Sequence, residues 1–418
     1  MRINLMRLNM RKFLPLAFAA ALVLSAVATV VPAVYAFVPV TQSAACGATL
    51  TANTIITPPI FHCALPVDVT IGAPNIVVEC KGVLTAGVGA GIGIDNPGYT
   101  GVSIIGCTLK GYTTGIEINT ATSNNLLGDT AENSIGDGFY IVNSVSTTLT
   151  KDRALSNGAD GFDLRGSSYS LLLGNTAKSN TGSGFYFSGD SYDTISSNTA
   201  TADVINGFIL TGSIDSILTG NKASGTTASN DGFLFTGSSN GNSLISSTSV
   251  LNGHDGIQVT SSNNIFLNSN GVKANGHDGI ELDTSSATIL LSNKAPANGN
   301  DGIQLVSSNN NYLYANSASC AASSTGTATC NLHDGIELDG SNSNWLVSNT
   351  ASSNHNDGIH LDAASGTSGF NFMSGNTESY NAHYDREDDS TGSGTDGTSN
   401  IWIGDISATN LTFPALLP

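Results

Sequence analysis

The sequence predicts an all-β fold, a single-stranded parallel β-helix of about 12 coils with ~23 residues per coil. The first observation is a repeated phrase. Residues 252–259 read Asn-Gly-His-Asp-Gly-Ile-Gln-Val, and residues 275–283 repeat it as Asn-Gly-His-Asp-Gly-Ile-Glu-Leu-Asp. The second is that apolar residues alternate with period two after the glycine of each repeat, which is typical of strands. The third is the composition, because 47 glycines and abundant Ser, Thr and Asn leave few helix formers.

Three columns of residues follow from this register. A marker glycine recurs from Gly91 to Gly358 at intervals of mostly 23 residues, with one interval of 33. The next residue is Ile or Phe in every coil, beginning at Ile92, and a second apolar residue follows two positions later. The third column is mostly Asn and includes Thr248 in one coil. In coils stacked ~4.8 Å apart, the first two columns become rows of like side chains in a narrow core, and the third becomes an asparagine ladder.

The domain organisation follows from where this repeat begins and ends. The β-helix is expected over residues 86–376, between an N-terminal cap at residues 37–85 and a C-terminal cap and tail at residues 377–418. Caps are needed because the end coils would otherwise expose sheet edges. A leucine-rich horseshoe is the competing architecture, because residues 346–351 resemble part of its consensus. That fold needs more leucines per repeat and often a helical return segment, so we favour the β-helix.

Residues 1–36 have the features of a secretory signal peptide. Four basic residues precede a largely apolar run at residues 13–31, and Val34-Tyr35-Ala36 resembles a cleavage site. An uncleaved membrane anchor is the alternative, because the apolar run is long. All 32 acidic residues but only ten of the 14 basic residues follow Ala36, so the mature chain carries a net charge of −22. This charge argues against nucleic acid and anionic membranes as partners. We expect a protein that is secreted, extracellular or on the cell surface.

Six cysteines in an exported chain predict disulfide bonds. Fifteen pairings are possible, and buried free thiols are the alternative. The simplest arrangement pairs each cysteine with its neighbour, which joins Cys46 to Cys63, Cys80 to Cys107, and Cys320 to Cys330. The last pair brackets the insertion behind the 33-residue interval, which we expect to form an outward loop.

Several of these motifs resemble a known family. They are Asp-Gly-Ile-x-Leu followed by Ser-Ser-x-Asn, Leu-x-x-Asn-x-Ala, the opening Cys46-Gly47 with Cys63, and the closing Thr398-Ser-Asn-Ile-Trp402. Over residues 45–405 the chain resembles the NosD-type, or carbohydrate-binding and sugar-hydrolase, β-helix repeat proteins. The resemblance implies a right-handed parallel β-helix of the pectin-lyase type. It implies no catalytic residue, because the matching motifs are structural.

The outward positions of the main strand place two groups of functional side chains on one flat face. An earlier cluster is expected to bind substrate and consists of Tyr140, Asp163, Arg165 and Tyr186. A later cluster is a candidate catalytic set and consists of Glu337, Asp339, His360 and Asp362. Stacked carboxylates repel each other, so a bound cation, with Ca²⁺ as the candidate cofactor, would stabilise them. The candidate metal ligands are Glu281, Asp283, Asp339 and Asp362. The alternatives are a solvated acidic face and a surface ion pair between Asp163 and Arg165.

A further column of aspartates precedes the marker glycines, and His254, His277 and His333 precede three of them. Loop-edge hydrogen bonding, in which each aspartate accepts a turn N–H beside a glycine with positive φ, is a simpler explanation than a calcium ladder. Two functions remain open. One is recognition, with or without chemical modification, of an extracellular polysaccharide or cell-surface glycan by a lyase-, epimerase- or hydrolase-like scaffold. The other is a non-catalytic structural or adhesion role at the cell surface.

Overall fold

The structure is a computed structural model that describes residues 40–42, 47–57, 62–63, 67–86, 91–320, 330–362, 368–407 and 412–414. Val40–Pro418 form one compact unit, separate from Met1–Pro39. The predicted signal segment at residues 1–36 therefore lies outside the described residues. Within the described ranges, we find no helix with the length and apolar character needed to cross a membrane.

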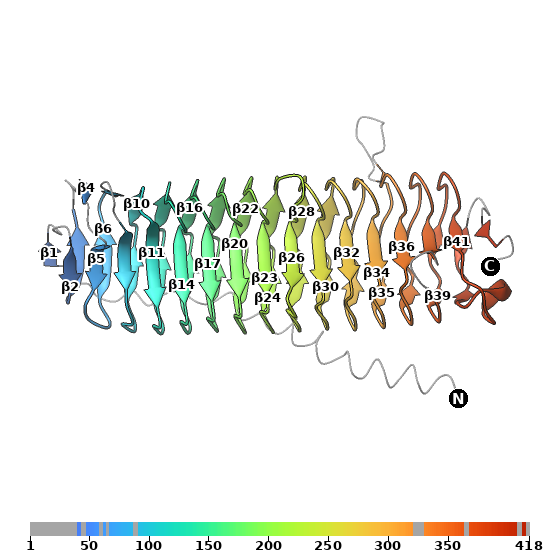
Figure 1. The fold of residues 1–418 in the computed structure, drawn as a ribbon, viewed down its shortest axis with the longest axis horizontal. Coiled ribbons are helices and arrows are strands. Elements are labelled where there is room, and N and C mark those ends of the chain that lie inside the picture. The colour runs from blue at the N-terminus through green and yellow to red at the C-terminus, as the bar shows by residue number, and fades with distance from the viewer. Residues whose placement is uncertain are drawn as a thin grey trace. The chain divides into compact units, whose positions relative to one another are not determined.

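The main sheet contains sixteen parallel strands, one from each successive coil (Figure 1). They are β2 (Ala48–Leu50), β5 (Val67–Ile71), β8 (Ile92–Asn96), β11 (Thr114–Asn119), β14 (Phe139–Val142), β17 (Phe162–Arg165), β20 (Phe185–Ser188), β23 (Phe208–Thr211), β26 (Phe233–Thr236), β29 (Ile257–Thr260), β32 (Ile280–Asp283), β34 (Ile303–Val306), β36 (Ile336–Asp339), β38 (Ile359–Asp362), β41 (Arg386–Asp388) and β44 (Thr412–Phe413).

A second sheet also contains sixteen strands. They are β1 (Val40–Gln42), β3 (Thr54–Ile56), β6 (Val77–Cys80), β9 (Ser103–Ile105), β12 (Asn125–Leu127), β15 (Thr148–Thr150), β18 (Leu171–Leu173), β21 (Thr194–Ser196), β24 (Ile217–Thr219), β27 (Ser243–Ile245), β30 (Phe266–Asn268), β33 (Ile289–Leu291), β35 (Tyr312–Tyr314), β37 (Trp345–Val347), β39 (Phe372–Ser374) and β42 (Ile401–Ile403).

A third sheet has ten strands. They are β4 (His62–Cys63), β7 (Val83–Ala86), β10 (Thr108–Lys110), β13 (Thr130–Glu132), β16 (Arg153–Leu155), β19 (Thr176–Lys178), β22 (Thr199–Thr201), β25 (Lys222–Ser224), β28 (Thr248–Val250) and β31 (Gly271–Lys273). Isolated bridges continue it as far as Thr377, where β40 (Thr377–Glu378) pairs with β43 (Ile406–Ser407). A short 3-10 helix, η2, covers Thr395–Gly397.

This strand order confirms the predicted parallel β-helix, because each coil contributes one strand to each sheet before the chain returns to the main sheet. The right-handed sense of the coil stays a prediction. The stack is longer than the expected 12 coils. Its strands continue into residues 37–85 and 377–418, where the sequence lacks the marker phrase but still supplies alternating apolar residues. Leu50, for example, pairs in register with Ile71 on the next coil.

The core is built from stacked like side chains, as predicted. Phe139, Phe162 and Phe185 lie in register on β14, β17 and β20. Their ring centroids are 4.7 and 4.8 Å apart, with interplanar angles of 8° and 3°. Phe208 and Phe233 continue this stack. The spacing equals the distance between neighbouring strands, so a parallel coil places each ring directly above the last one.

Two positions of the predicted register were wrong. Ile94, and not Ile92, pairs with Ile116, so Gly93 is the marker glycine of that coil. The segment contains two consecutive Gly-Ile pairs, and periodicity alone cannot choose between them. In the third column, Ser247 occupies the place assigned to Thr248. Its hydroxyl accepts the backbone N–H of Asn221 at 3.2 Å.

The marker glycines are required for close packing and not for positive φ, which corrects the expectation from the sequence. A Cβ on Gly138 would lie 2.7 Å from the carbonyl oxygen of Gly161 on the next coil and 2.8 Å from Nδ2 of Asn157. Gly138 does not belong to the positive-φ residues. A larger residue would therefore force adjacent coils apart at the start of the main strand.

The asparagine ladder is confirmed. Asn293 donates its Nδ2 to Oδ1 of Asn316 at 3.0 Å and to the carbonyl oxygen of Leu267 at 2.9 Å. Its own Oδ1 accepts the backbone N–H and the Nδ2 of Asn270, both at 3.0 Å. Each amide thus pairs with the coil on either side and satisfies backbone groups that the bend leaves open.

The structure adds parallel ladders that the sequence analysis did not identify. A second asparagine row runs along another corner as Asn252, Asn275, Asn298, Asn331, Asn354 and Asn381. A row of mostly serine follows the main strand, and Asp190 interrupts it between Ser167 and Ser213. These rows line the three corners of the coil, which explains why polar residues are so abundant in a fold with a continuous apolar core.

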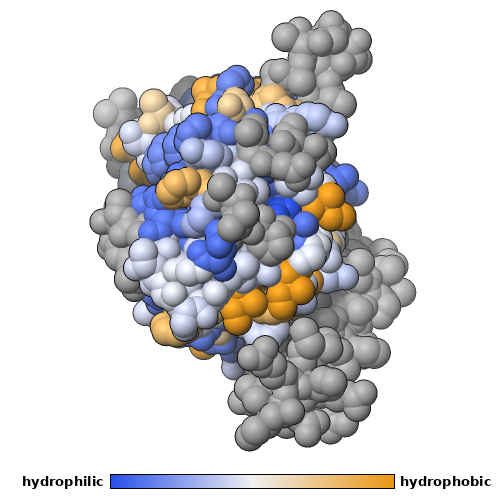
Figure 2. All heavy atoms as spheres, turned by 90° about the vertical axis from the view of Figure 1, so that its right-hand side faces the viewer, coloured by the Kyte–Doolittle hydropathy of each residue, from blue (hydrophilic) through white to orange (hydrophobic). Residues whose placement is uncertain are grey.

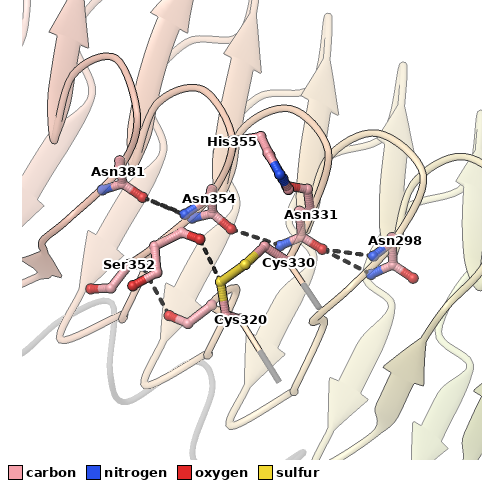
Figure 3. The surroundings of a disulfide bond; sticks show 10 residues. Asn298, Cys320, Cys330, Asn331, Ser352, Asn354, His355 and Asn381 are labelled. Carbon is pink, nitrogen blue, oxygen red and sulfur yellow. Dashed lines mark hydrogen bonds between the residues drawn. A yellow bond between two sulfur atoms is a disulfide. The ribbon is translucent and has the colours of Figure 1, made fainter. Parts of the chain in front are cut away.

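Two disulfide bonds are confirmed, Cys80–Cys107 and Cys320–Cys330. Cys46 lies outside the described residues, so the proposed Cys46–Cys63 pair stays a prediction. The second disulfide closes the base of the insertion beside the second asparagine row (Figure 3). Ile303 pairs in register with Ile336, so the 33-residue interval leaves the main-sheet register intact. The extra residues of this interval lie in the sequence between the two cysteines.

The C-terminal end replaces the apolar stack with buried polar pairs. Arg386 follows Ile359 in the core column and donates its Nε to Glu378 at 2.9 Å, with both side chains at most 1% exposed. Trp402 Nε1 on β42 donates to Asp388 on β41 at 2.9 Å. Figure 2 faces this end and shows hydrophobic patches lying between hydrophilic residues. The end coil is therefore closed partly by polar groups, which reduces the apolar edge available for stacking.

Candidate functional site

The outer face of the main sheet carries the residues selected from the sequence. In β14 and β20, alternation places the first and third residues of the strand in the core and the second and fourth outside. Parallel register then aligns the outward residues of neighbouring coils. Tyr140 lies beside Asp163, which lies beside Tyr186, and Arg165 lies in the next outward row.

The structure brings the earlier cluster together. Arg165 binds the Asp163 carboxylate through Nε at 2.9 Å and through Nη2 at 2.7 Å. Its guanidinium carbon lies 5.7 Å from the Tyr140 ring centroid and 5.4 Å from the Tyr186 ring centroid. The guanidinium is therefore held between two aromatic rings from the coils on either side. The result is a preformed platform of two rings and one cation.

Burial within this platform is uneven. The Asp163 side chain is fully buried, whereas the Arg165 side chain is 50% exposed. Burial raises the pKa of Asp163, and its hydrogen bonds to Arg165 oppose that rise. Nearby, burial raises the pKa of Asp137 to about 6 and that of Asp160 to about 7. The charge of Asp163 contributes to both increases. Arg165 thus anchors on the buried carboxylate while its outer surface remains available to a ligand.

Histidines gather along one edge of the main sheet, which the sequence analysis treated as loop-edge polarity. His254, His277, His333 and His383 each point Nδ1 at an aspartate of the preceding coil, at 2.9–3.2 Å. The first two rings stack with centroids 4.9 Å apart. The aspartates also accept backbone N–H groups of the next coil, as Asp255 does from Asp278 at 2.8 Å. This part of the prediction, N–H acceptance by the aspartate column, is confirmed.

The aspartates stabilise the charged form of these histidines. Hydrogen bonds donated to Asp231 and Asp255 raise the pKa of His254 to about 10. Hydrogen bonds donated to Asp255 and Asp278 raise the pKa of His277 to about 11. A row of imidazolium groups can therefore neutralise part of the aspartate column along this edge.

The later cluster centres on His360, which lies in the first outward row. Its Nδ1 is 3.2 Å from Asp334 and 3.7 Å from Glu337. Its Nε2 is 3.7 Å from Asp389 and 3.9 Å from Glu387. Although burial opposes protonation, the hydrogen bond with Asp334 and the surrounding carboxylates raise the pKa of His360 to about 10. Asp334, Glu387 and Asp389 were not among the residues selected from the sequence.

The remaining predicted residues lie in other parts of this face. Asp339 and Asp362 are neighbours in the second outward row. Val306 lies between Asp283 and Asp339 in that row, so Asp283 is two coils away from Asp339 and three coils away from Asp362. Glu281 accepts a hydrogen bond from Gln258 at 2.7 Å, and burial together with Asp255 raises its pKa to about 8.

The signal that could have identified the missing residues was weak. Asp334 belongs to the aspartate column, which the sequence does display. Glu387 and Asp389 lie after the repeat phrase has ended, in the run His383-Tyr-Asp-Arg-Glu-Asp-Asp389. Only the pairing of β38 with β41 places Glu387 beside His360.

The comparisons with known proteins come from sequence and from structure. The family model described as "Periplasmic copper-binding protein (NosD)" matches residues 74–246 and 226–402. No curated protein sequence gives a significant match.

Among solved structures, a double mutant of the periplasmic alginate epimerase AlgG has a TM-score of 0.52 at 15% identity, covering 77% of this chain and 84% of that chain. A DFA-IIIase from Arthrobacter chlorophenolicus A6, in complex with GF2, has a TM-score of 0.50 at 13% identity, covering 71% and 83%. The A-module of the Azotobacter vinelandii mannuronan C-5 epimerase AlgE6 has a TM-score of 0.39 at 15% identity, covering 88% of each chain. At these identities the first two similarities establish the shared fold.

The residues present can be tested against copper, which the family description names. Cu⁺ prefers sulfur ligands, but the four cysteines in the described disulfides are oxidised and Met373 is fully buried in the core. Cu²⁺ accepts imidazole nitrogen and carboxylate oxygen, and several groups of histidines and carboxylates place one ligand atom each within 4.8 Å of one another. The donors on the described coils therefore fit a divalent ion better than Cu⁺.

Proposed function

Because the chain belongs to the NosD family of β-helix proteins, we propose that it binds a polysaccharide along the outer face of its main sheet. The observation that carries this proposal is the platform of Tyr140, Arg165 and Tyr186. The two disulfides suit an oxidising compartment, which is where a periplasmic or extracellular glycan would be met.

The platform has the properties that sugar recognition requires. Aromatic rings offer apolar surface to the C–H faces of a sugar, and the tyrosine hydroxyls offer hydrogen bonds. Tyr140 and Tyr186 are two coils apart, which corresponds to ~10 Å along the stack. Arg165 between them supplies donors for hydroxyl or carboxylate groups. The arrangement is already ordered by Asp163, so little conformational entropy is lost on binding.

The face continues in a direction suited to an extended chain. Ile209 and Leu234 follow Tyr186 in the same outward row and are partly exposed. A polymer that runs parallel to the coil axis would cross the aromatic platform and then this apolar stretch. The net charge of −22 after Ala36 disfavours highly anionic polymers, so we favour neutral chains or chains of low charge density.

Binding is tested with purified, soluble polysaccharides. The panel contains neutral β-glucan and galactomannan, alginate and pectate, and affinity is measured by calorimetry at low and moderate salt. A double variant, Tyr140→Ala with Tyr186→Ala, should weaken binding of the preferred polymer at least ~10-fold, which corresponds to ~1.4 kcal/mol. The same samples are assayed for chain cleavage and for altered sugar stereochemistry.

The chain offers a matched control for this experiment. Tyr169 and Tyr192 are also stacked, with ring centroids 5.2 Å apart and exposures of 59% and 48%, but they lie on a turn outside the platform. Their replacement by Ala should leave affinity unchanged. Equal losses from both pairs, or no binding across the panel, would remove the basis for this proposal. The second outcome would favour a non-catalytic structural role at the cell surface.

A further inference from the structure

We propose that His360, Glu387 and Asp389 form a binding site for one divalent transition-metal ion at the C-terminal end of the main sheet. This inference is independent of the proposed polysaccharide site, which lies many coils away on β14–β20. It assigns particular residues to an ion of the kind that the family description implies.

The three ligand atoms converge from two neighbouring strands. His360 on β38 pairs in register with Glu387 on β41, and Asp389 follows directly after that strand. Nε2 of His360 lies 3.9 Å from Glu387 Oε2 and 3.7 Å from Asp389 Oδ2. A tetrahedral ion with bonds of ~2.1 Å needs ligand atoms ~3.4 Å apart, so small side-chain adjustments would complete the site. Asp389 is the most exposed of the three, at 38%, and can adjust most readily.

His360 is already oriented as a metal ligand. Its Nδ1 faces the fully buried Asp334 at 3.2 Å, which is the carboxylate–histidine contact that fixes the ring in metal sites. Its Nε2 is buried and, among the residues that the structure describes, takes no hydrogen bond. The only groups it approaches within ion-pair distance in those ranges are the two carboxylates named above. A polar nitrogen held in this way is costly unless a cation or proton occupies the space in front of it.

The surrounding charge favours a cation with a charge greater than one. Four carboxylates surround the imidazole, namely those of Asp334, Glu337, Glu387 and Asp389. A protonated imidazole would neutralise only one of these carboxylates when all are ionised. A divalent ion would neutralise two, and it would also satisfy the buried nitrogen.

The site differs from the other histidine contacts of the chain. His254, His277 and His333 repeat one arrangement, in which Nδ1 contacts aspartates at the sheet edge. That arrangement is the regular consequence of the repeat. His360 lies instead in the outward row, where other coils carry Gln258, Glu281 or Gln304, and it has carboxylates at both ring nitrogens. An imidazole ligand selects Cu²⁺ or Zn²⁺ over Ca²⁺, which prefers oxygen ligands alone.

The test uses the full chain after removal of metals with a chelator. Calorimetric titration with Cu²⁺, and separately with Zn²⁺, should show one ion bound with high affinity, and Ca²⁺ should bind far more weakly. The Cu²⁺ form should give an electron paramagnetic resonance spectrum with nitrogen coupling from a single imidazole. His360→Asn should remove that coupling and weaken binding at least ~10-fold, and Glu387→Gln should weaken binding while retaining the nitrogen coupling.

His254→Asn is the matched control, because it removes an imidazole from the repeated edge contact and leaves this site intact. Circular dichroism and thermal unfolding confirm that each variant is folded, and Glu387→Gln keeps the test decisive if His360→Asn does not fold. The proposal fails if no ion binds stoichiometrically. It also fails if His360→Asn and Glu387→Gln bind as the unmodified chain does, or if His254→Asn causes the same loss.

Discussion

Replacement of Asp190 by serine should remove a loss of stability that the unmodified β-helix undergoes as the pH rises from ~4 to about 8. Asp190 lies in the serine row, is 1% exposed, and accepts backbone N–H groups from Ser167 and Ser188. Burial, with the charge of Asp193, raises the pKa of Asp190 to about 8 against the opposing effect of these hydrogen bonds. Serine occupies the equivalent place on both neighbouring coils, so Asp190→Ser fits the local structure.

The sign and size of the effect follow from proton linkage. The pKa of Asp190 is about 8 in the folded chain, whereas an unfolded aspartate has a pKa near ~3.9. The folded state therefore holds an extra proton between these values, and the stabilisation present below pH ~4 is lost as the pH rises to ~8. A difference of roughly four pH units corresponds to ~5 kcal/mol of unfolding free energy. Asp190→Ser removes the titrating group, so the variant lacks this pH-dependent change in unfolding free energy.

The assay is urea unfolding followed by circular dichroism at several pH values from about 5 to about 9. The difference in midpoint between Asp190→Ser and the unmodified chain should grow in favour of the variant as the pH rises to about 8, and it should then level off. Comparing the two proteins removes the contribution of other buried carboxylates, which titrate in both.

An exposed carboxylate on a nearby turn provides the control. Asp215→Asn is the matched substitution, because Asp215 is solvent-exposed and its left-handed backbone conformation is one that asparagine also adopts. If Asp190→Ser and the unmodified chain lose the same stability between about pH 5 and about pH 9, the linkage argument is incorrect.

Three further substitutions test the core and the ladders, each by urea unfolding. Phe185→Ala should lower the free energy of unfolding by ~3–5 kcal/mol, because it opens a cavity between two stacked rings. Phe185→Leu should lower it much less, and equal losses would contradict the stacking argument. Asn293→Ala should lower the free energy of unfolding by at least ~2 kcal/mol, because it leaves buried donors on the preceding coil without an acceptor. An unchanged free energy of unfolding would show that the ladder does not stabilise the fold. Arg386→Met should lower the free energy of unfolding by ~3–5 kcal/mol, because it leaves Glu378 buried and unpaired. The double variant with Glu378→Met should recover most of this loss.

The regular part of the fold was predictable because one short phrase recurs at the main strand of successive coils and marks its core residues. Phe139, Phe162 and Phe185 occupy the same place in each repeat, so the strand spacing alone predicts that their rings stack. The same reasoning failed at Gly91 and Thr248, where a neighbouring residue satisfied the pattern equally well. Only backbone pairing identified Gly93 and Ser247 as the true positions.

The candidate sites divide in the same way. Alternation and register were sufficient to place Tyr140, Arg165 and Tyr186 together, because all three lie within the regular array. The surroundings of His360 were only partly accessible, since Glu387 and Asp389 come from the segment after the repeat ends.

The amino-acid order alone specifies the repeat period, the apolar columns and the outward rows, since each depends on local alternation and on identical residues recurring at one interval. It also specified which cysteines are neighbours, and Cys80–Cys107 and Cys320–Cys330 follow that order. The folded chain was needed to establish the length of the stack, the second asparagine row, the serine row and the carboxylates around His360. Those features depend on which residues of different coils are adjacent in space, and no periodicity extends through the irregular last coils to specify that adjacency.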